Sequence, residues 1–168
     1  ASRLGELSLA DAQLAAINGP PKAEEHPELA QRVLVAQAAR ACASGDTAAG
    51  LRQLQPLLDS GKALYSAHVT RFDCLHGPGA LDQRAAQAQW LADHRGLAYS
   101  EIHGDYALWF FNVAFSTMVW LELAEAARDG SPELAEQSLR RFEQSWPATH
   151  WTAELRARVA AVQLHTAP

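Results

Sequence analysis

Apolar residues recur at intervals of three and four along most of the chain, and glycine and proline interrupt this pattern. The spacing is typical of amphipathic helices, as in the stripe formed by Leu51, Leu54 and Leu58. Because the connections are short, we expect consecutive helices to pack as antiparallel hairpins. The expected helices cover approximately residues 8–18, 27–44, 61–76, 81–95, 105–129 and 132–146. Between the second and third of these, another helix is expected to begin near residue 47, and the last helix is expected to begin near residue 152.

Several residues at the ends of these segments favour helix boundaries. Ser131 can cap a helix that has Pro132 in its first turn, and Pro27 begins another helix in the same way. Asp46 or Thr47 can cap the helix that follows the turn near residue 45. These residues predict where three of the expected helices begin.

Two other positions carry more specific expectations about helix geometry. Ser8 and Asp11 have the spacing of a capping box, so the first helix should begin at Ser8 and end before Gly19. Pro56 has no backbone N–H and clashes with the preceding turn of a helix. We therefore expect Pro56 to bend or break its helix.

The most apolar stretch of the chain is DYALWFFNVAFSTMVWL. It is shorter than the roughly 20 residues that a membrane span requires, and polar residues interrupt it. We therefore expect no membrane span, but a central core helix over about 105–129. Asn112 and Ser116 share one face of this helix and must find polar partners. Those partners lie either on neighbouring helices or in a small cavity below the loop at 101–105.

Composition supports an all-α fold. Alanine and leucine are abundant, whereas isoleucine occurs only at Ile17 and Ile102. Good helix formers therefore outnumber the β-branched residues that favour strands. The length suits one domain, and no linker divides it, so we expect a single all-α domain over 1–168.

The charge of the chain narrows its possible partners. The net charge is −5, from 19 acidic and 14 basic residues, and no polybasic run is present. This balance suits a soluble protein and gives no electrostatic reason to expect nucleic acid as a partner. The oligomeric state stays open.

Cys42 and Cys74 are compatible with two states. They can form a disulfide in an oxidising compartment, or lie in the core as two small apolar side chains. Because the apolar content needs no additional cross-link, we expect free thiols. The first residue is not Met, which fits either a removed signal peptide or a trimmed chain. The expected location is accordingly the cytoplasm or, after export, the periplasm.

Residues 39–61 and 123–147 share a sequence plan. Each has an alanine-rich helix end, a glycine-containing turn and an amphipathic helix. Small residues in the second helix would let the two helices of a hairpin approach closely. The aligned pairs are Gly45 with Gly130, Gly50 with Ala135, and Leu54 with Leu139.

This plan resembles a degenerate tetratricopeptide repeat. Gly130, Ala135 and Pro147 match the family's pattern, and Gly45 and Gly50 match it without a following proline. The family's early Trp, Leu-Gly pair and Tyr are missing from both windows. The resemblance implies hairpins packed either as a repeat array or as an orthogonal bundle. It also implies a scaffold that binds proteins on a concave surface rather than an enzyme.

The segment 94–106 contains the densest group of polar side chains. His94, Glu101, His103 and Asp105 are side chains that can ligate a metal or exchange protons, and loops often carry such groups. Their spacing matches no known metal motif, and Asp105 also suits a helix cap. We expect no cofactor, and keep a small-ligand or metal site at this loop, possibly enzymatic, as the alternative function.

Tryptophan is the most informative aromatic residue. Trp146 and Trp151 flank the turn WPATHW, and Trp90 lies near the end of an expected helix. Their main expected use is core packing, with a groove for a peptide or apolar ligand as the other interpretation. We therefore expect a non-enzymatic module that binds a protein or peptide partner in a groove between hairpins, with these tryptophans as candidate partner-binding residues.

Overall fold

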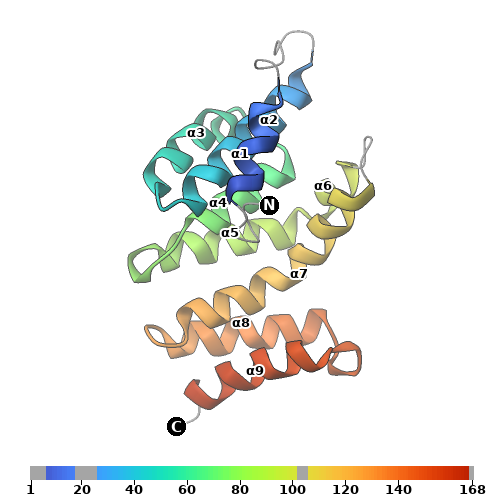
Figure 1. Ribbon diagram of the computed structural model, residues 1–168. Coiled ribbons are helices and arrows are strands. Elements are labelled where there is room, and N and C mark those ends of the chain that lie inside the picture. The colour runs from blue at the N-terminus through green and yellow to red at the C-terminus, as the bar shows by residue number, and fades with distance from the viewer. Residues whose placement is uncertain (1–6, 18–25, 102–105, 167–168) are drawn as a thin grey trace. The chain divides into compact units, whose positions relative to one another are not determined.

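The computed structural model describes residues 7–17, 26–101 and 106–166, and all regular secondary structure in these ranges is helical (Figure 1). The chain forms two compact units, Ala1–Leu75 and His76–Pro168, and each is described by itself. The single domain over 1–168 stays a prediction. The helices of unit 1 are α1 (Leu7–Ala15), α2 (Pro27–Ala43), α3 (Thr47–Asp59) and α4 (Tyr65–Cys74). Unit 2 contains η2 (Pro78–Ala80), α5 (Leu81–Asp93), α6 (Arg95–Ser100), α7 (Tyr106–Ala127), α8 (Pro132–Ser145), η3 (Ala148–His150) and α9 (Ala153–Thr166).

Unit 1 is built on the hairpin formed by α2 and α3. The turn between them contains Gly45, whose φ of +95° is favourable only for glycine. Asp46 then caps α3, because its carboxylate accepts a hydrogen bond of 3.0 Å from the backbone N–H of Ala49. Helix α4 packs against both helices of the hairpin, and α1 packs against α2. The expected cap at Asp46 is thus confirmed.

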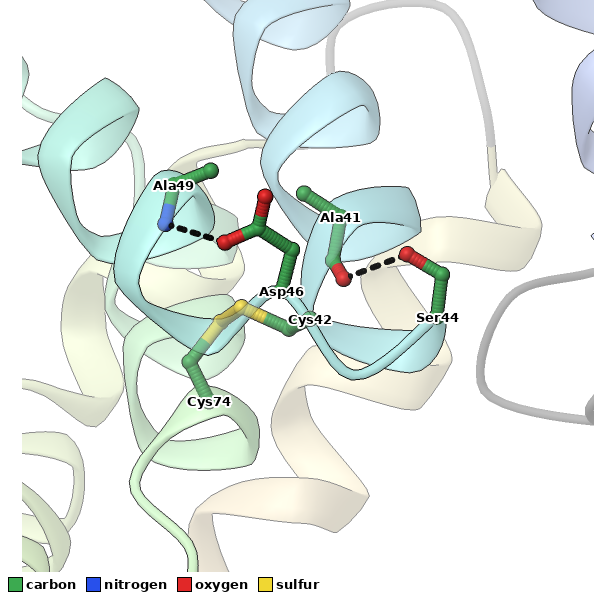
Figure 2. The surroundings of a disulfide bond; sticks show 6 residues. All are labelled: Ala41, Cys42, Ser44, Asp46, Ala49 and Cys74. Atoms are coloured by element: carbon green, nitrogen blue, oxygen red, sulfur yellow. Dashed lines mark hydrogen bonds between the residues drawn. A yellow bond between two sulfur atoms is a disulfide. The ribbon is translucent and has the colours of Figure 1, made fainter.

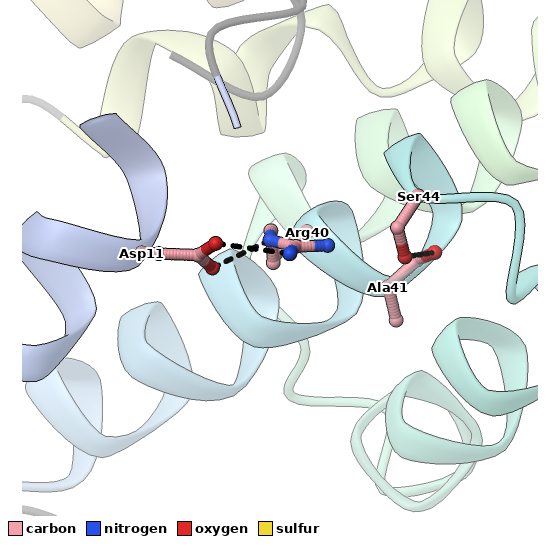
Figure 3. A network of polar contacts seen from close by, with 4 residues as sticks. All are labelled: Asp11, Arg40, Ala41 and Ser44. Carbon is pink, nitrogen blue, oxygen red and sulfur yellow. Dashed lines mark hydrogen bonds and ion pairs between the residues drawn. The ribbon is translucent and has the colours of Figure 1, made fainter. Parts of the chain in front are cut away.

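Helix α1 is also attached to α2 by an ion pair. The Arg40 guanidinium donates hydrogen bonds of 2.6 and 2.9 Å to the two carboxylate oxygens of Asp11 (Figure 3). Ser8 lies inside α1, so the capping box expected from Ser8 and Asp11 is wrong. Asp11 serves instead as the acceptor for an arginine on the neighbouring helix.

Of the two outcomes expected at Pro56, a break is wrong, because α3 continues through Pro56 to Asp59, and a bend stays a prediction. Pro56 lies in the last part of the helix and its side chain is exposed. Only the hydrogen bond to the carbonyl of Arg52 is lost there, and solvent can reach both residues. A helix tolerates such a loss near its end.

The expectation of free thiols is wrong, because Cys42 and Cys74 form a disulfide (Figure 2). Cys42 is the last but one residue of α2, and Cys74 is the last residue of α4. Their Cα atoms are 5.3 Å apart, within the usual range for a disulfide. The bond lies in a core cluster with small and aliphatic side chains. The other buried members of this cluster are Val35, Ala38, Leu54 and Ala67.

Unit 2 is organised around α7, the apolar helix expected from the sequence. Helix α7 packs against α5, α6, α8 and α9. Leu121 and Leu123 of α7, Phe142 of α8 and Val162 of α9 are fully buried in this unit. A bidentate ion pair between Arg158 and Glu125, with bonds of 2.7 and 2.8 Å, also joins α9 to α7.

The start of α8 at Pro132 follows the sequence expectation, although the Ser131 side chain makes no capping hydrogen bond. In the ranges that the structure describes, no helix combines the length and apolar character needed to cross a bilayer.

The segment expected to be a loop at 94–106 contains a helix instead. Helix α5 ends at Asp93, and after one residue α6 runs from Arg95 to Ser100. Gly96 was expected to end the preceding helix, but it lies inside α6. The polar residues of this segment therefore project from a helical scaffold for most of its described length.

Candidate functional site

Short helix α6 is attached to α7 by a buried polar contact at its first residue. The Arg95 guanidinium donates a hydrogen bond of 2.9 Å from Nε to Ser116 Oγ, and one of 3.2 Å from a terminal nitrogen to Thr117 Oγ1. Ser116 is completely buried and Thr117 nearly so. Ser116 in turn donates to the carbonyl of Val113. The buried hydroxyl groups of α7 thus receive a charged hydrogen-bond partner.

A second polar contact attaches the other end of α6. The side-chain amide of Asn112 donates a hydrogen bond of 3.1 Å to a carboxylate oxygen of Glu101, the residue that follows α6. Asn112 is buried. Asn112 and Ser116, the polar stripe identified in the sequence, therefore both bond to residues at the two ends of α6. The sequence left open whether these partners would be a neighbouring helix or a cavity. Ser116 bonds to Arg95 in α6, and Asn112 bonds to Glu101, the first residue after α6.

His94 joins α5 to α6 and is held by Trp90. The two rings are stacked with their centroids 4.2 Å apart, and His94 Nδ1 lies 2.9 Å from the carbonyl oxygen of Trp90. Because a carbonyl oxygen can only accept, Nδ1 carries the proton of this bond. The Trp90 indole is half-buried and the His94 side chain is exposed. This pair fixes the direction of the chain between the two helices.

Two large apolar side chains of α6 are partly exposed, one on each flank of the helix, because residues two positions apart in a helix project about 200° from each other. Leu97 is 41% exposed and Tyr99 is 45% exposed, whereas Ala98 between them is fully buried. We call Leu97 and Tyr99 together the α6 surface. A helix that is held by polar bonds at both ends thus presents an aliphatic and an aromatic side chain to solvent.

Trp146 and Trp151 close the turn between α8 and α9. The Trp151 indole N–H donates a hydrogen bond of 2.7 Å to the carbonyl oxygen of Trp146. Both rings also pack on the buried ring of Phe142, at centroid distances of 6.2 Å for Trp146 and 5.7 Å for Trp151. Each tryptophan is half-buried. Their main observed contacts are therefore within unit 2.

The metal-site hypothesis at 94–106 rests partly on residues outside the structural description. His103 and Asp105 lie outside the described residues, and Glu101 bonds to Asn112. In the described part of the chain, no three His, Cys, Asp or Glu side chains come close enough together to hold a metal ion. A site at this segment stays a prediction.

Sequence reasoning missed Arg95, which attaches α6 to α7, and the exposed side chains of Leu97 and Tyr99. The adjacent hydroxyls of Ser116 and Thr117 in an apolar helix were a signal that a polar partner was required. The identity of that partner depends on which helix packs there, and spacing along the chain does not determine this.

Comparison of the chain with protein-family models, with curated proteins and with solved structures gives no match. The interpretation of the site therefore rests on its own geometry.

Proposed function

We propose that this chain is a non-enzymatic helical interaction module, a scaffold or regulatory domain that binds an apolar segment of a partner protein or peptide. The observation that carries the proposal is the arrangement of α6. Arg95 and Glu101 attach its ends to α7, while Leu97 and Tyr99 remain partly exposed. A surface that is already ordered loses little conformational entropy when a partner binds.

The chemistry of the α6 surface suits a protein partner. Tyrosine contributes a large contact area with few rotatable bonds, and aromatic residues are enriched at the centres of interfaces. Leu97, on the other flank of α6, offers an aliphatic contact. The expected partner segment therefore presents aliphatic or aromatic side chains, with polar groups only at the edge of the contact.

We also propose that the exposed parts of three tryptophan rings contact the partner, those of Trp90, Trp146 and Trp151. Each is half-buried and takes part in packing, so replacing it would also disturb unit 2. The α6 surface offers a cleaner test, because Leu97 and Tyr99 are the more exposed residues.

A repeat relationship between the hairpins α2–α3 and α7–α8 is part of the same proposal. It is supported by the burial of Gly50 and Ala135 at equivalent positions, four residues into α3 and α8, and of Leu54 and Leu139 one turn later. The turns differ, however, since Gly45 has a positive φ and Gly130 does not. In helical repeat proteins, a groove between hairpins is a common binding surface.

The test is site-specific crosslinking in cells that produce the full chain. A photoreactive amino acid is placed at Leu97 or at Tyr99, and at exposed Gln137 on α8 as the matched control. We expect one protein to crosslink from both α6 positions and not from the control. With that protein purified, Leu97→Ser and Tyr99→Ser should each weaken binding about tenfold, because truncating an interface anchor costs more than about 1 kcal/mol. Gln137→Ala should bind normally.

Unchanged affinity of both α6 variants for the crosslinked protein would refute the proposal, as would the absence of any crosslink. Elemental analysis of the purified full chain addresses the alternative function. A stoichiometric metal that is lost on His94→Ala or His103→Ala would favour a metal site at 94–106 instead.

A further inference from the structure

The disulfide joins two helices that are distant in sequence. Cys42 and Cys74 are separated by 32 positions, and the bond closes a loop that contains all of α3. Cys74 is fully buried and Cys42 is only 8% exposed. The sulfur atoms therefore lie inside the core of unit 1 rather than at its rim (Figure 2).

The backbone of α3 lies directly against one of the sulfur atoms. A Cβ atom added at Gly50 would overlap Sγ of Cys42 and would lie 2.8 Å from the carbonyl oxygen of Ala38. Glycine is thus required at this position for steric reasons, since α3 passes too close to α2 for any side chain. Helix α3 consequently covers the disulfide on that side.

This packing restricts thiol–disulfide exchange, because a thiolate must reach a sulfur atom to attack it. In folded unit 1, Cys74 is fully buried and α3 blocks the approach to Sγ of Cys42 from its side. The same restriction applies to formation of the bond. An external oxidant therefore reaches the cysteines most readily before α3 has docked.

We infer that unit 1 is completed by oxidation in a compartment that supplies a disulfide oxidant, and that α3 then shields the Cys42–Cys74 bond from reductants. The oxidant is a protein or small molecule that carries an exchangeable disulfide. One cysteine thiolate attacks a sulfur of that disulfide and expels a thiolate, and the second cysteine thiolate then displaces the oxidant from the mixed disulfide. The chain's two thiols lose two electrons and two protons, and the oxidant is reduced to two thiols. Stable disulfides of this kind are typical of extracellular and periplasmic proteins.

The first test measures the redox state of the cysteines in cells that produce the full chain. The cells are quenched with acid, and free thiols are labelled in denaturant with a mass-tagged maleimide. We expect no label without prior reduction and labelling of both cysteines after reduction. Two labelled cysteines in the unreduced sample would overturn the inference.

The second test measures shielding on the purified full chain. Dithiothreitol should reduce the native disulfide at least about 100-fold more slowly than the disulfide in urea, because reduction must await local opening. Gly50→Ala should accelerate native reduction, since an added methyl group displaces α3 from Cys42. The control is Gly96→Ala, at a position where a Cβ meets nothing within 4 Å.

Equal reduction rates in the native and unfolded wild-type chain would overturn the shielding by α3. A folded Gly50→Ala variant that is reduced as slowly as the Gly96→Ala control would do the same.

Discussion

The second helices of the hairpins α2–α3 and α7–α8 begin alike, but the two hairpins are held together by different contacts. Asp46 and Ser131 occupy the cap positions, and a small buried residue follows four positions later, Gly50 in α3 and Ala135 in α8. The α2–α3 hairpin packs against a disulfide that joins α2 to α4. The α7–α8 hairpin instead buries the large ring of Phe142.

The difference shows that two similar helical hairpins can be stabilised in different ways. The buried cluster that contains the disulfide holds aliphatic side chains and no aromatic ring, and the covalent cross-link adds to the stability that this apolar packing supplies. In unit 2, α7 has neighbours on several sides and contributes Leu121, Leu123 and Trp120 to the core. Packing there needs no cross-link.

Among the changes that test this comparison, removing the disulfide should cause the largest loss of stability. The double variant Cys42→Ala, Cys74→Ala releases a loop closed across 32 positions, and chain entropy predicts a loss of roughly 3 to 4 kcal/mol in the free energy of unfolding. Urea denaturation followed by circular dichroism measures this loss. The reduced wild-type chain is the control, because it keeps both sulfur atoms without the bond. If neither form is less stable than the oxidised chain, the disulfide does not stabilise unit 1.

Exchanging the small residues at the equivalent positions should have the next largest effect. Gly50→Ala overpacks the contact with Cys42 and should destabilise by about 1 to 3 kcal/mol, despite the better helix propensity of alanine. Ala135→Gly should cost about 1 kcal/mol, mainly through helix propensity. Gly96→Ala has open space and should be neutral or slightly stabilising. The thermal unfolding midpoints of the three variants test these expectations. A Gly50→Ala variant as stable as Gly96→Ala would exclude a close contact between Gly50 and Cys42.

The two cap positions should differ in a smaller way. Asp46 accepts a hydrogen bond from the Ala49 N–H, so Asp46→Ala should destabilise by about 1 kcal/mol. The Ser131 side chain makes no such bond, so Ser131→Ala should have less effect. The urea midpoints of the two variants, compared with wild type, test this. Equal losses would show that both caps contribute alike.

The smallest effect concerns the attachment of α1. Hydrogen bonds from Arg40 hold the pKa of the Asp11 carboxyl below its ordinary value of 3.8. The stability from this pair is therefore present above that ordinary value and is lost as the pH falls through the lowered pKa. Because Asp11 is exposed and Arg40 is partly exposed, the effect should be small and should decrease with salt. Asp11→Asn should reduce the acid dependence of the unfolding midpoint, whereas identical pH profiles would show that the pair contributes nothing.

The sequence predicted most of the helices for identifiable reasons. Pro27 and Pro132 mark the starts of α2 and α8, and the apolar run marks α7. Helix α6 was missed because its segment is rich in polar residues and contains Gly96, features that usually indicate a loop. Its stability comes from contacts with α7, which local sequence does not encode.

The candidate site was predicted only in part. Asn112 and Ser116 were recognised as groups that need partners, but the partners Glu101 and Arg95 depend on how α6 packs. The disulfide was missed for a similar reason. Two cysteines in a chain with a large apolar content are compatible with either state, and only the arrangement of α2 and α4 brings them together.

The central claim is that the disulfide stabilises the α2–α3 hairpin, whereas packing stabilises the α7–α8 hairpin. Hydrogen exchange of the full chain, oxidised and reduced, tests it most directly because it reports on each helix separately. We predict that on reduction the backbone amides of α2, α3 and α4 exchange at least about 100-fold faster, as the closure entropy implies. Those of α7 and α8 should keep their rates. Equal acceleration in both hairpins, or none in α2–α4, would contradict the account.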